Sequence, residues 1–71
     1  MRGEVTGTIP IVQEDRIRVV DDDGRGYLFV VRKGAAAHDD LVSWRDTAAR
    51  VRVRFVGTPD AGARAVRITE G

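Results

Sequence analysis

The sequence predicts a small all-β domain of five short strands. Runs of β-branched and aromatic residues alternate along the chain with clusters of glycine, proline and aspartate, the residues that favour turns. In residues 50–56, arginines alternate with apolar residues, which is typical of a strand with one buried face. The 71-residue chain contains no cysteine, so we expect a single domain, residues 1–71, held together by packing alone.

The first strand is expected over residues 4–12. Gly7 in its middle predicts a bulge or a sharp bend, of the kind that a small barrel needs at a corner. Pro10 has no backbone N–H to donate, so that part of the strand should lie at an edge or at a bulge.

The second and third strands are expected to form a hairpin, with residues 16–20 and 27–31 joined by a turn over residues 21–26. We predict that Ile17 and Val19 point into the core, because the opposite phase would bury the guanidinium of Arg18 without a partner. The exposed face of the hairpin is then predicted to carry Arg16, Arg18 and Val20 beside Tyr27, Phe29 and Val31, with Arg32 and Lys33 at its end.

Residues 34–49 lack the alternation of a strand and are too many for a hairpin turn. We therefore expect a long loop with at most one helical turn, for which Asp39 or Asp40 is the candidate N-cap. Leu41 and Trp44 are three residues apart and would share a face of that turn. Trp44 either fixes the loop against the domain or stacks on a ligand.

The last two strands are expected over residues 50–56 and 64–69, with a loop of turn residues over 57–62. The predicted inward side chains are Val51, Val53 and Phe55 in the former strand, with Val66 and Ile68 on one face of the latter and Ala65, Arg67 and Thr69 on the other. The outward row of Arg50, Arg52 and Arg54 is either the solvated side of an amphipathic strand or a stripe that tracks phosphates.

Five short strands with one long connection after the third indicate a sheet that closes on itself to hide its edges. The small fold of this kind is the five-stranded antiparallel Greek-key OB barrel, here with a long loop between strands 3 and 4. In OB barrels the outer face of strands 2 and 3 commonly forms the binding surface.

Four segments resemble the cold-shock domain family in their order and spacing, across nearly the whole chain. Residues 1–9 contain the Thr-Gly pair of the family's opening strand, and residues 22–24 resemble its acidic turn. Residues 28–30 match the start of its V-F-V-H-F motif, and residues 62–68 are similar to its G-P-x-A-x-x-V ending. The K-G-F-G-F motif would fall on residues 16–20, where only the basic Arg16 matches, and Val31 and Arg32 replace the last two residues of V-F-V-H-F.

This resemblance implies weak binding of single-stranded RNA or DNA with little sequence preference, as by an RNA chaperone. Guanidiniums and aromatic rings stack on bases, and guanidiniums also contact phosphates. A formal net charge of +1 argues against strong non-specific affinity. The predicted nucleic-acid-binding residues are Arg16, Arg18, Val20, Tyr27, Phe29, Val31, Arg32 and Lys33.

The alternative is a protein–protein interaction module on an OB barrel that has lost nucleic-acid binding. It would bind a protein partner or self-associate through an exposed apolar patch, since monomers rarely leave such a patch uncovered. The predicted patch consists of Ile11, Val20, Tyr27, Phe29 and Val31.

The sequence offers no set of residues for catalysis, so we expect no enzymatic activity and no catalytic residues. His38 beside Asp39 and Asp40 is too small a set for a metal site, and the acidic turn lacks the distal glutamate of a calcium loop. We therefore expect neither a metal nor a cofactor. Without a signal-peptide-like or membrane-spanning apolar run, we expect a cytoplasmic protein with no membrane partner.

Overall fold

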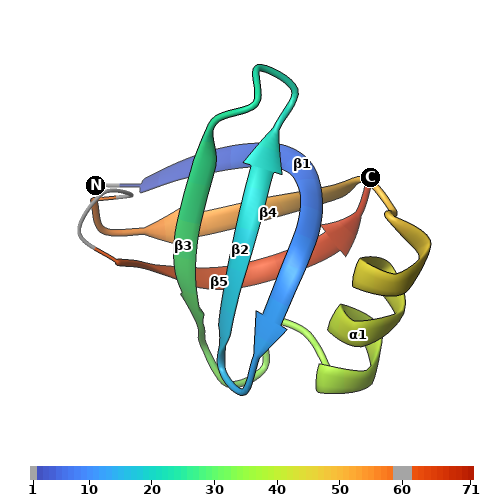
Figure 1. The fold of residues 1–71 in the computed structure, drawn as a ribbon. Coiled ribbons are helices and arrows are strands. Elements are labelled where there is room, and N and C mark those ends of the chain that lie inside the picture. The colour runs from blue at the N-terminus through green and yellow to red at the C-terminus, as the bar shows by residue number, and fades with distance from the viewer. Residues whose placement is uncertain (1, 59–61) are drawn as a thin grey trace.

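The computed structural model describes residues 2–58 and 62–71, which form one five-stranded sheet and a single helix (Figure 1). The elements are β1 (Arg2–Gln13), β2 (Arg16–Asp21), β3 (Gly26–Val31), α1 (His38–Thr47), β4 (Val51–Val56) and β5 (Ala63–Glu70). The predicted all-β class with five strands is confirmed. Of the predicted loop over residues 57–62, residues 59–61 lie outside the described part of the chain.

The strands follow the order β1-β2-β3-β5-β4, and β4 also pairs with β1, so the sheet closes on itself. Four of the pairings are antiparallel, as predicted, and the pairing of β3 with β5 is parallel. The prediction of a wholly antiparallel sheet is therefore wrong at this one pairing. A parallel neighbour is possible here because the chain between β3 and β5 is a long crossover that contains α1 and β4.

The first strand pairs with two neighbouring strands, and it bends at Gly7, where one pairing gives way to the other. Residues 2–7 pair with β4, and the strand continues along β2 from Gly7 onward. A Cβ atom on Gly7 would come within 2.0 Å of the Val20 carbonyl oxygen, so only glycine lets the two backbones approach this closely. The register with β2 shifts between Thr8 and Ile11, which places Pro10 at an irregularity. The predictions for Gly7 and Pro10 are confirmed.

The core fills the inside of the closed sheet. Its buried members are Val5, Ile9, Ile17, Val19, Phe29, Leu41, Val51, Val53, Phe55, Ala63, Ala65 and Ile68. The rings of Phe29 and Phe55 pack against each other within it, with centroids 5.3 Å apart. The inward orientation predicted for Ile17, Val19 and the apolar residues of β4 is confirmed.

The segment between β3 and β4 contains a ten-residue helix, so the prediction of at most one helical turn is wrong. Its N-cap is Ala37, without a side-chain hydrogen bond, so the predicted aspartate cap is also wrong. Asp39 and Asp40 instead lie in the first turn, where carboxylates interact favourably with the helix dipole. As predicted, Leu41 and Trp44 share a face: Leu41 is buried, and Trp44 is half-buried against the core.

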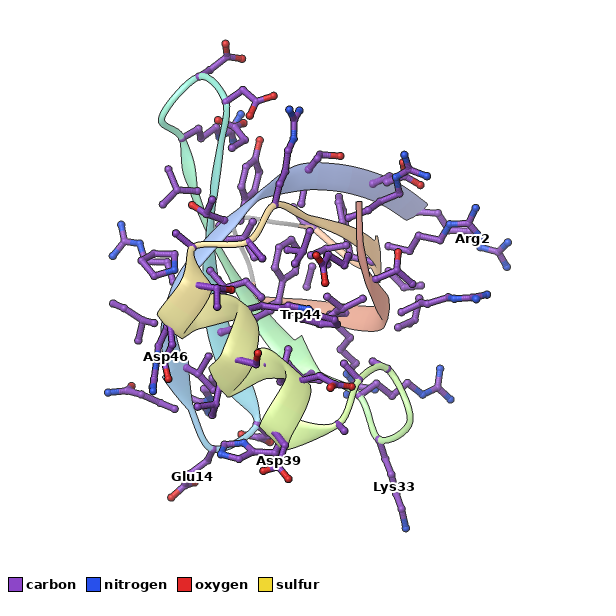
Figure 2. The ribbon with its side chains drawn as sticks, turned by 90° about the vertical axis from the view of Figure 1, so that its right-hand side faces the viewer. Arg2, Glu14, Lys33, Asp39, Trp44 and Asp46 are labelled. Carbon is purple, nitrogen blue, oxygen red and sulfur yellow. The ribbon has the colours of Figure 1, made fainter. Side chains whose placement is uncertain are left out.

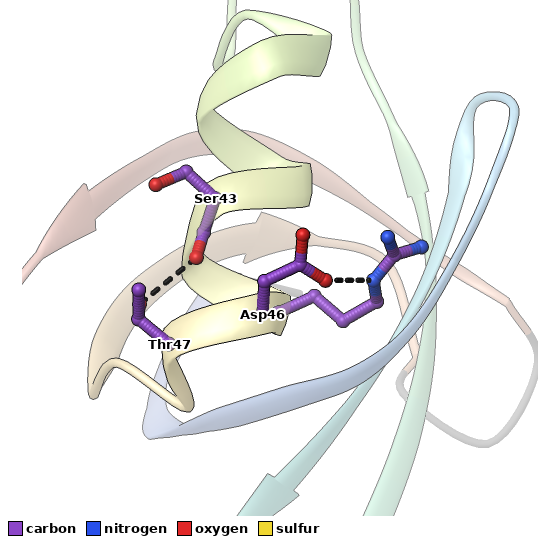
Figure 3. Close-up of polar contacts among 4 residues, drawn as sticks. Ser43, Asp46 and Thr47 are labelled. Atoms are coloured by element: carbon purple, nitrogen blue, oxygen red, sulfur yellow. Dashed lines mark hydrogen bonds and ion pairs between the residues drawn. The ribbon is translucent and has the colours of Figure 1, made fainter.

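Two contacts hold the side chain of Trp44 in place: its ring packs on the core, and its Nε1 donates to Glu70 Oε1 at 3.2 Å. Figure 3 shows two further contacts near the C-terminal end of α1. The Thr47 hydroxyl donates to the Ser43 carbonyl oxygen at 2.9 Å, and Arg45 Nε donates to Asp46 at 3.0 Å. The interpretation of Trp44 as an anchor is confirmed.

The alternation of β5 breaks in the middle of the strand. Arg54 pairs with Arg67 and Phe55 with Ala65, which leaves Val66 as an extra residue opposite β4. Because such an irregularity reverses the side to which later residues point, Ala65 and Ile68 are both buried. The prediction that Ala65 faces away from Ile68 is therefore wrong.

Candidate nucleic-acid interface

The turn between β2 and β3 determines which residues of β3 face outward. Gly24 donates its N–H to the Asp21 carbonyl oxygen, and the Asp21 N–H donates to the carbonyl oxygen of Arg25, both at 3.0 Å. This closes a three-residue loop in which Gly24 has φ +85°, a conformation that suits glycine. The register that follows sets Ile17 opposite Phe29.

Directly paired residues of an antiparallel sheet point to the same side, so Phe29 follows Ile17 into the core. Its side chain is 0% exposed, and the prediction that it lies on the outer face is wrong. Tyr27 and Val31 share this inward phase and are half-buried against the core, so their predicted exposure is also wrong. The predicted apolar patch consequently does not form around Phe29.

Arg16 and Arg18 are exposed as predicted, and Val20 is half-buried on the same side of β2. Arg32 and Lys33 are exposed beyond the end of β3. Arg32 lines a hollow together with Arg2, Glu4 and Arg54, so it lies beside residues of β1 and β4. Of the eight predicted residues, the structure thus brings together Arg16, Arg18 and Val20 on one outer face.

We define the hairpin face as the nine outward positions where β1 pairs with β2 and β2 pairs with β3. The pairing arranges them in three rows: Thr8, Val20 and Gly26; Ile11, Arg18 and Leu28; Gln13, Arg16 and Val30. Ile11 and Leu28, 44% and 53% exposed, flank Arg18. The face holds two arginines and no acid. Our sequence reasoning missed Gln13, Leu28 and Val30, although counting residues across the turn identifies the two in β3.

Gly26 makes room for the side chain of Arg18. A Cβ atom at Gly26 would lie 3.0 Å from Nη2 and 3.1 Å from Nε of Arg18, so the guanidinium lies directly over the bare glycine backbone. Neither Arg16 nor Arg18 forms an ion pair with a residue in the ranges 2–58 and 62–71. Both guanidiniums are therefore available to an anion or to the face of a base.

Tyr27 is held within the hairpin by its neighbours. Its hydroxyl donates to Asp21 Oδ2 at 3.2 Å, its ring stacks on Phe29, and the guanidinium of Arg25 lies 5.1 Å from the ring centroid. Burial raises the pKa of Tyr27, and the hydrogen bond to Asp21 raises it further. These contacts give Tyr27 a structural role at the base of the turn.

Asp21 organises the turn itself. Its Oδ1 accepts hydrogen bonds from the backbone N–H groups of Arg25, at 2.9 Å, and Asp23, at 3.0 Å. The hydrogen bond from Arg25 is the main reason that the pKa of Asp21 is lowered, against the opposing effect of desolvation. The lowered pKa favours the ionised carboxylate, whose hydrogen bonds hold the turn that sets Phe29 opposite Ile17.

Comparison with known proteins finds no matching family model, no matching curated protein and no matching solved structure. No three metal-binding side chains gather anywhere in the part of the chain that the structure describes. Across the same residues, no helix has the length and apolar character needed to cross a membrane.

Proposed function

We propose that this chain is a five-stranded Greek-key OB barrel of cold-shock type that binds single-stranded RNA or DNA weakly and with little sequence preference. The strand order supports the fold, since the sheet closes through β1 and β4 and the hairpin of β2 and β3 presents one wet face. That face is the usual ligand surface of OB barrels.

One observation carries the proposal: the hairpin face has two unpaired guanidiniums and no acid, in a chain with 11 acidic residues. Guanidinium planes stack on bases and donate to phosphates, and the aliphatic side chains of Ile11 and Leu28 offer further surface to a base. An aromatic ring under a base contributes about 1–3 kcal/mol, and this face has none. Binding is accordingly weak and largely electrostatic.

The test is a fluorescence-anisotropy titration of labelled oligo-dT and oligo-U, repeated at several salt concentrations. Two phosphate contacts to a single strand predict a slope of about −1.4 in log K against log salt. Arg16→Gln combined with Arg18→Gln should remove most of that slope. Arg45→Gln is the matched control, because Arg45 lies on α1 and pairs with Asp46.

Absence of binding at high micromolar protein would refute the proposal. So would binding that the Arg16→Gln/Arg18→Gln variant retains in full.

The alternative proposal is a protein-interaction module that uses the same face. Ile11 and Leu28 are exposed there, but Arg18 separates them and Phe29 contributes nothing to the surface. This arrangement favours a ligand with both flat and anionic parts over an apolar partner. In amide chemical-shift mapping, shifts on residues 16–33 with an oligonucleotide support nucleic-acid binding. The alternative is supported if the amides of residues 16–33 do not shift and light scattering shows self-association that Leu28→Ser abolishes.

A further inference from the structure

A second exposed face, on the outer side of β1, β4 and β5, holds five of the chain's arginines. We call it the arginine face. The pairing arranges it in three rows: Arg2, Val56 and Arg64; Glu4, Arg54 and Arg67; Thr6, Arg52 and Thr69. Glu4 is the only acid among these nine positions. In Figure 2, Arg2 projects on the opposite side of the molecule from Asp46 and Glu14.

The middle row places two positive charges directly opposite each other. Arg54 is the cross-strand partner of Arg67, and like charges in this position repel. One carboxylate relieves part of this repulsion, since the two oxygens of Glu4 lie 3.4 Å from Nε of Arg52 and 3.4 Å from Nε of Arg54. Arg67 has no ion-pair partner among residues 2–58 and 62–71. The row therefore has more positive charge than Glu4 can balance.

These side chains surround a shallow hollow. It is lined by Arg52, Arg54, Arg67 and Thr69, so three arginines and one threonine surround the same space and none of the four is acidic. Guanidinium N–H groups form a planar fork that matches the oxygens of a phosphate. Arg50, the next arginine along the chain, is not available to the hollow because it pairs with Asp22 at the tip of the hairpin.

We propose that the arginine face binds the phosphate groups of an extended phosphate chain. One phosphate lies between Arg54 and Arg67, and the next lies beside Arg52 and Thr69. These rows are two residues apart along β4, which is about 6.8 Å in an extended strand, so adjacent rows can hold successive phosphates. An inorganic oligophosphate and the backbone of a nucleic acid both supply this chemistry. The inference does not rest on the proposed function, because it uses none of the residues of the hairpin face.

The experiment follows backbone amide signals of the intact chain while sodium tripolyphosphate or a six-nucleotide oligo-dT is added. A sodium chloride titration at equal ionic strength corrects for screening. Tripolyphosphate should shift the amides of residues 52, 54, 67 and 69 well beyond the chloride control. Arg67→Gln should weaken this binding at least about fivefold, whereas Glu4→Gln should strengthen it by freeing two guanidiniums. Arg45→Gln again serves as the neutral control.

The two ligands distinguish the source of the phosphate. Shifts with tripolyphosphate alone assign the face to oligophosphates, and shifts with oligo-dT on the same residues assign it to a nucleic-acid backbone. The Arg16→Gln/Arg18→Gln variant should keep the tripolyphosphate shifts of residues 52, 54, 67 and 69, which separates this site from the hairpin face. Shifts no larger than those with chloride for both ligands, or equal affinity in Arg67→Gln and its parent, would overturn the inference.

Discussion

Replacing Phe29 with leucine should destabilise the domain without weakening oligonucleotide binding. The ring is 0% exposed, and its centroid lies 5.3 Å from that of Phe55 and 6.1 Å from that of Tyr27. No ligand on the hairpin face can reach it. Its contribution is therefore to the free energy of unfolding.

The size of the effect follows from the packing. Truncating a buried phenylalanine to alanine costs about 3–5 kcal/mol, whereas a hydrophobic exchange that conserves volume usually costs less than about 1.5 kcal/mol. Loss of the ring contacts adds about 0.5–1.5 kcal/mol, so we expect about 1–3 kcal/mol for Phe29→Leu. A domain of this length is stable by about 4–11 kcal/mol. Phe29→Leu should remain folded, whereas Phe29→Ala approaches the limit.

The assay is urea unfolding followed by the fluorescence of Trp44, the only tryptophan in the chain and a residue that packs on the core. Binding of oligo-dT is then measured well below the unfolding transition. Arg18→Gln is the matched comparison, since it should weaken binding and leave the urea midpoint in place. If Phe29→Leu unfolds at the same urea concentration as its parent but loses binding, Phe29 is a ligand contact and our reasoning fails.

Three further predictions concern the turn, the bend and the arginine face. Gly7→Ala should lower the free energy of unfolding by about 3 kcal/mol, and the urea midpoint with it, because its Cβ would overlap a backbone carbonyl of β2. Gly26→Ala meets only a flexible arginine side chain, so its effect should be mild. Ionised Asp21 should contribute its full stabilisation above its ordinary pKa of 3.8. This stabilisation should be lost as the pH falls through the lowered pKa of the folded state, which a carbon-13 NMR titration of the carboxyl group measures. Arg67→Glu should raise the thermal midpoint, by the equivalent of about 0.2–1 kcal/mol, because it gives Arg54 an opposite charge across the strands.

Equal urea midpoints for the two alanine variants would show that β1 can move away from β2 at Gly7. An Asp21 carboxyl group that titrates at 3.8 or above would show that its hydrogen bonds do not favour the ionised form. A lower thermal midpoint for Arg67→Glu would mean that Arg67 stabilises the fold through contacts other than its pairing with Arg54.

The strand that was predicted best is the one whose two faces differ most. In β4 every second residue is an arginine, so burying the valines and Phe55 is the only arrangement without a buried charge. In β3 all residues from Tyr27 to Val31 are apolar, and alternation cannot say which of them point inward. Which residues of β3 point inward depends on the length of the turn. The backbone hydrogen bond between Asp21 and Arg25 closes that turn as a three-residue loop. Counting that turn would have placed Phe29 in the core.

The other differences arise from contacts that a local pattern does not contain. Helix α1 presents only Leu41 and Trp44 to the core, so its sequence lacks a wide apolar stripe, and packing rather than periodicity stabilises it. The irregularity at Val66 is defined by the register between β5 and β4. Ala63 and Ala65 of β5 are buried in a core whose two phenylalanine rings come from β3 and β4.

Side chains at the outward positions of the closed sheet can act in binding without contributing to the packing of the core. The core of β4 and β5 is complete without any arginine, since every guanidinium on these strands lies on the solvent side. Threonine would suit those positions in a strand at least as well and would avoid the repulsion between Arg54 and Arg67. Packing therefore explains the inner residues of these strands but not the charge of the outer ones. The phosphate ligand that we propose for the arginine face would supply the missing interaction, and its binding should be tightest where the protein's own carboxylates leave guanidiniums unpaired.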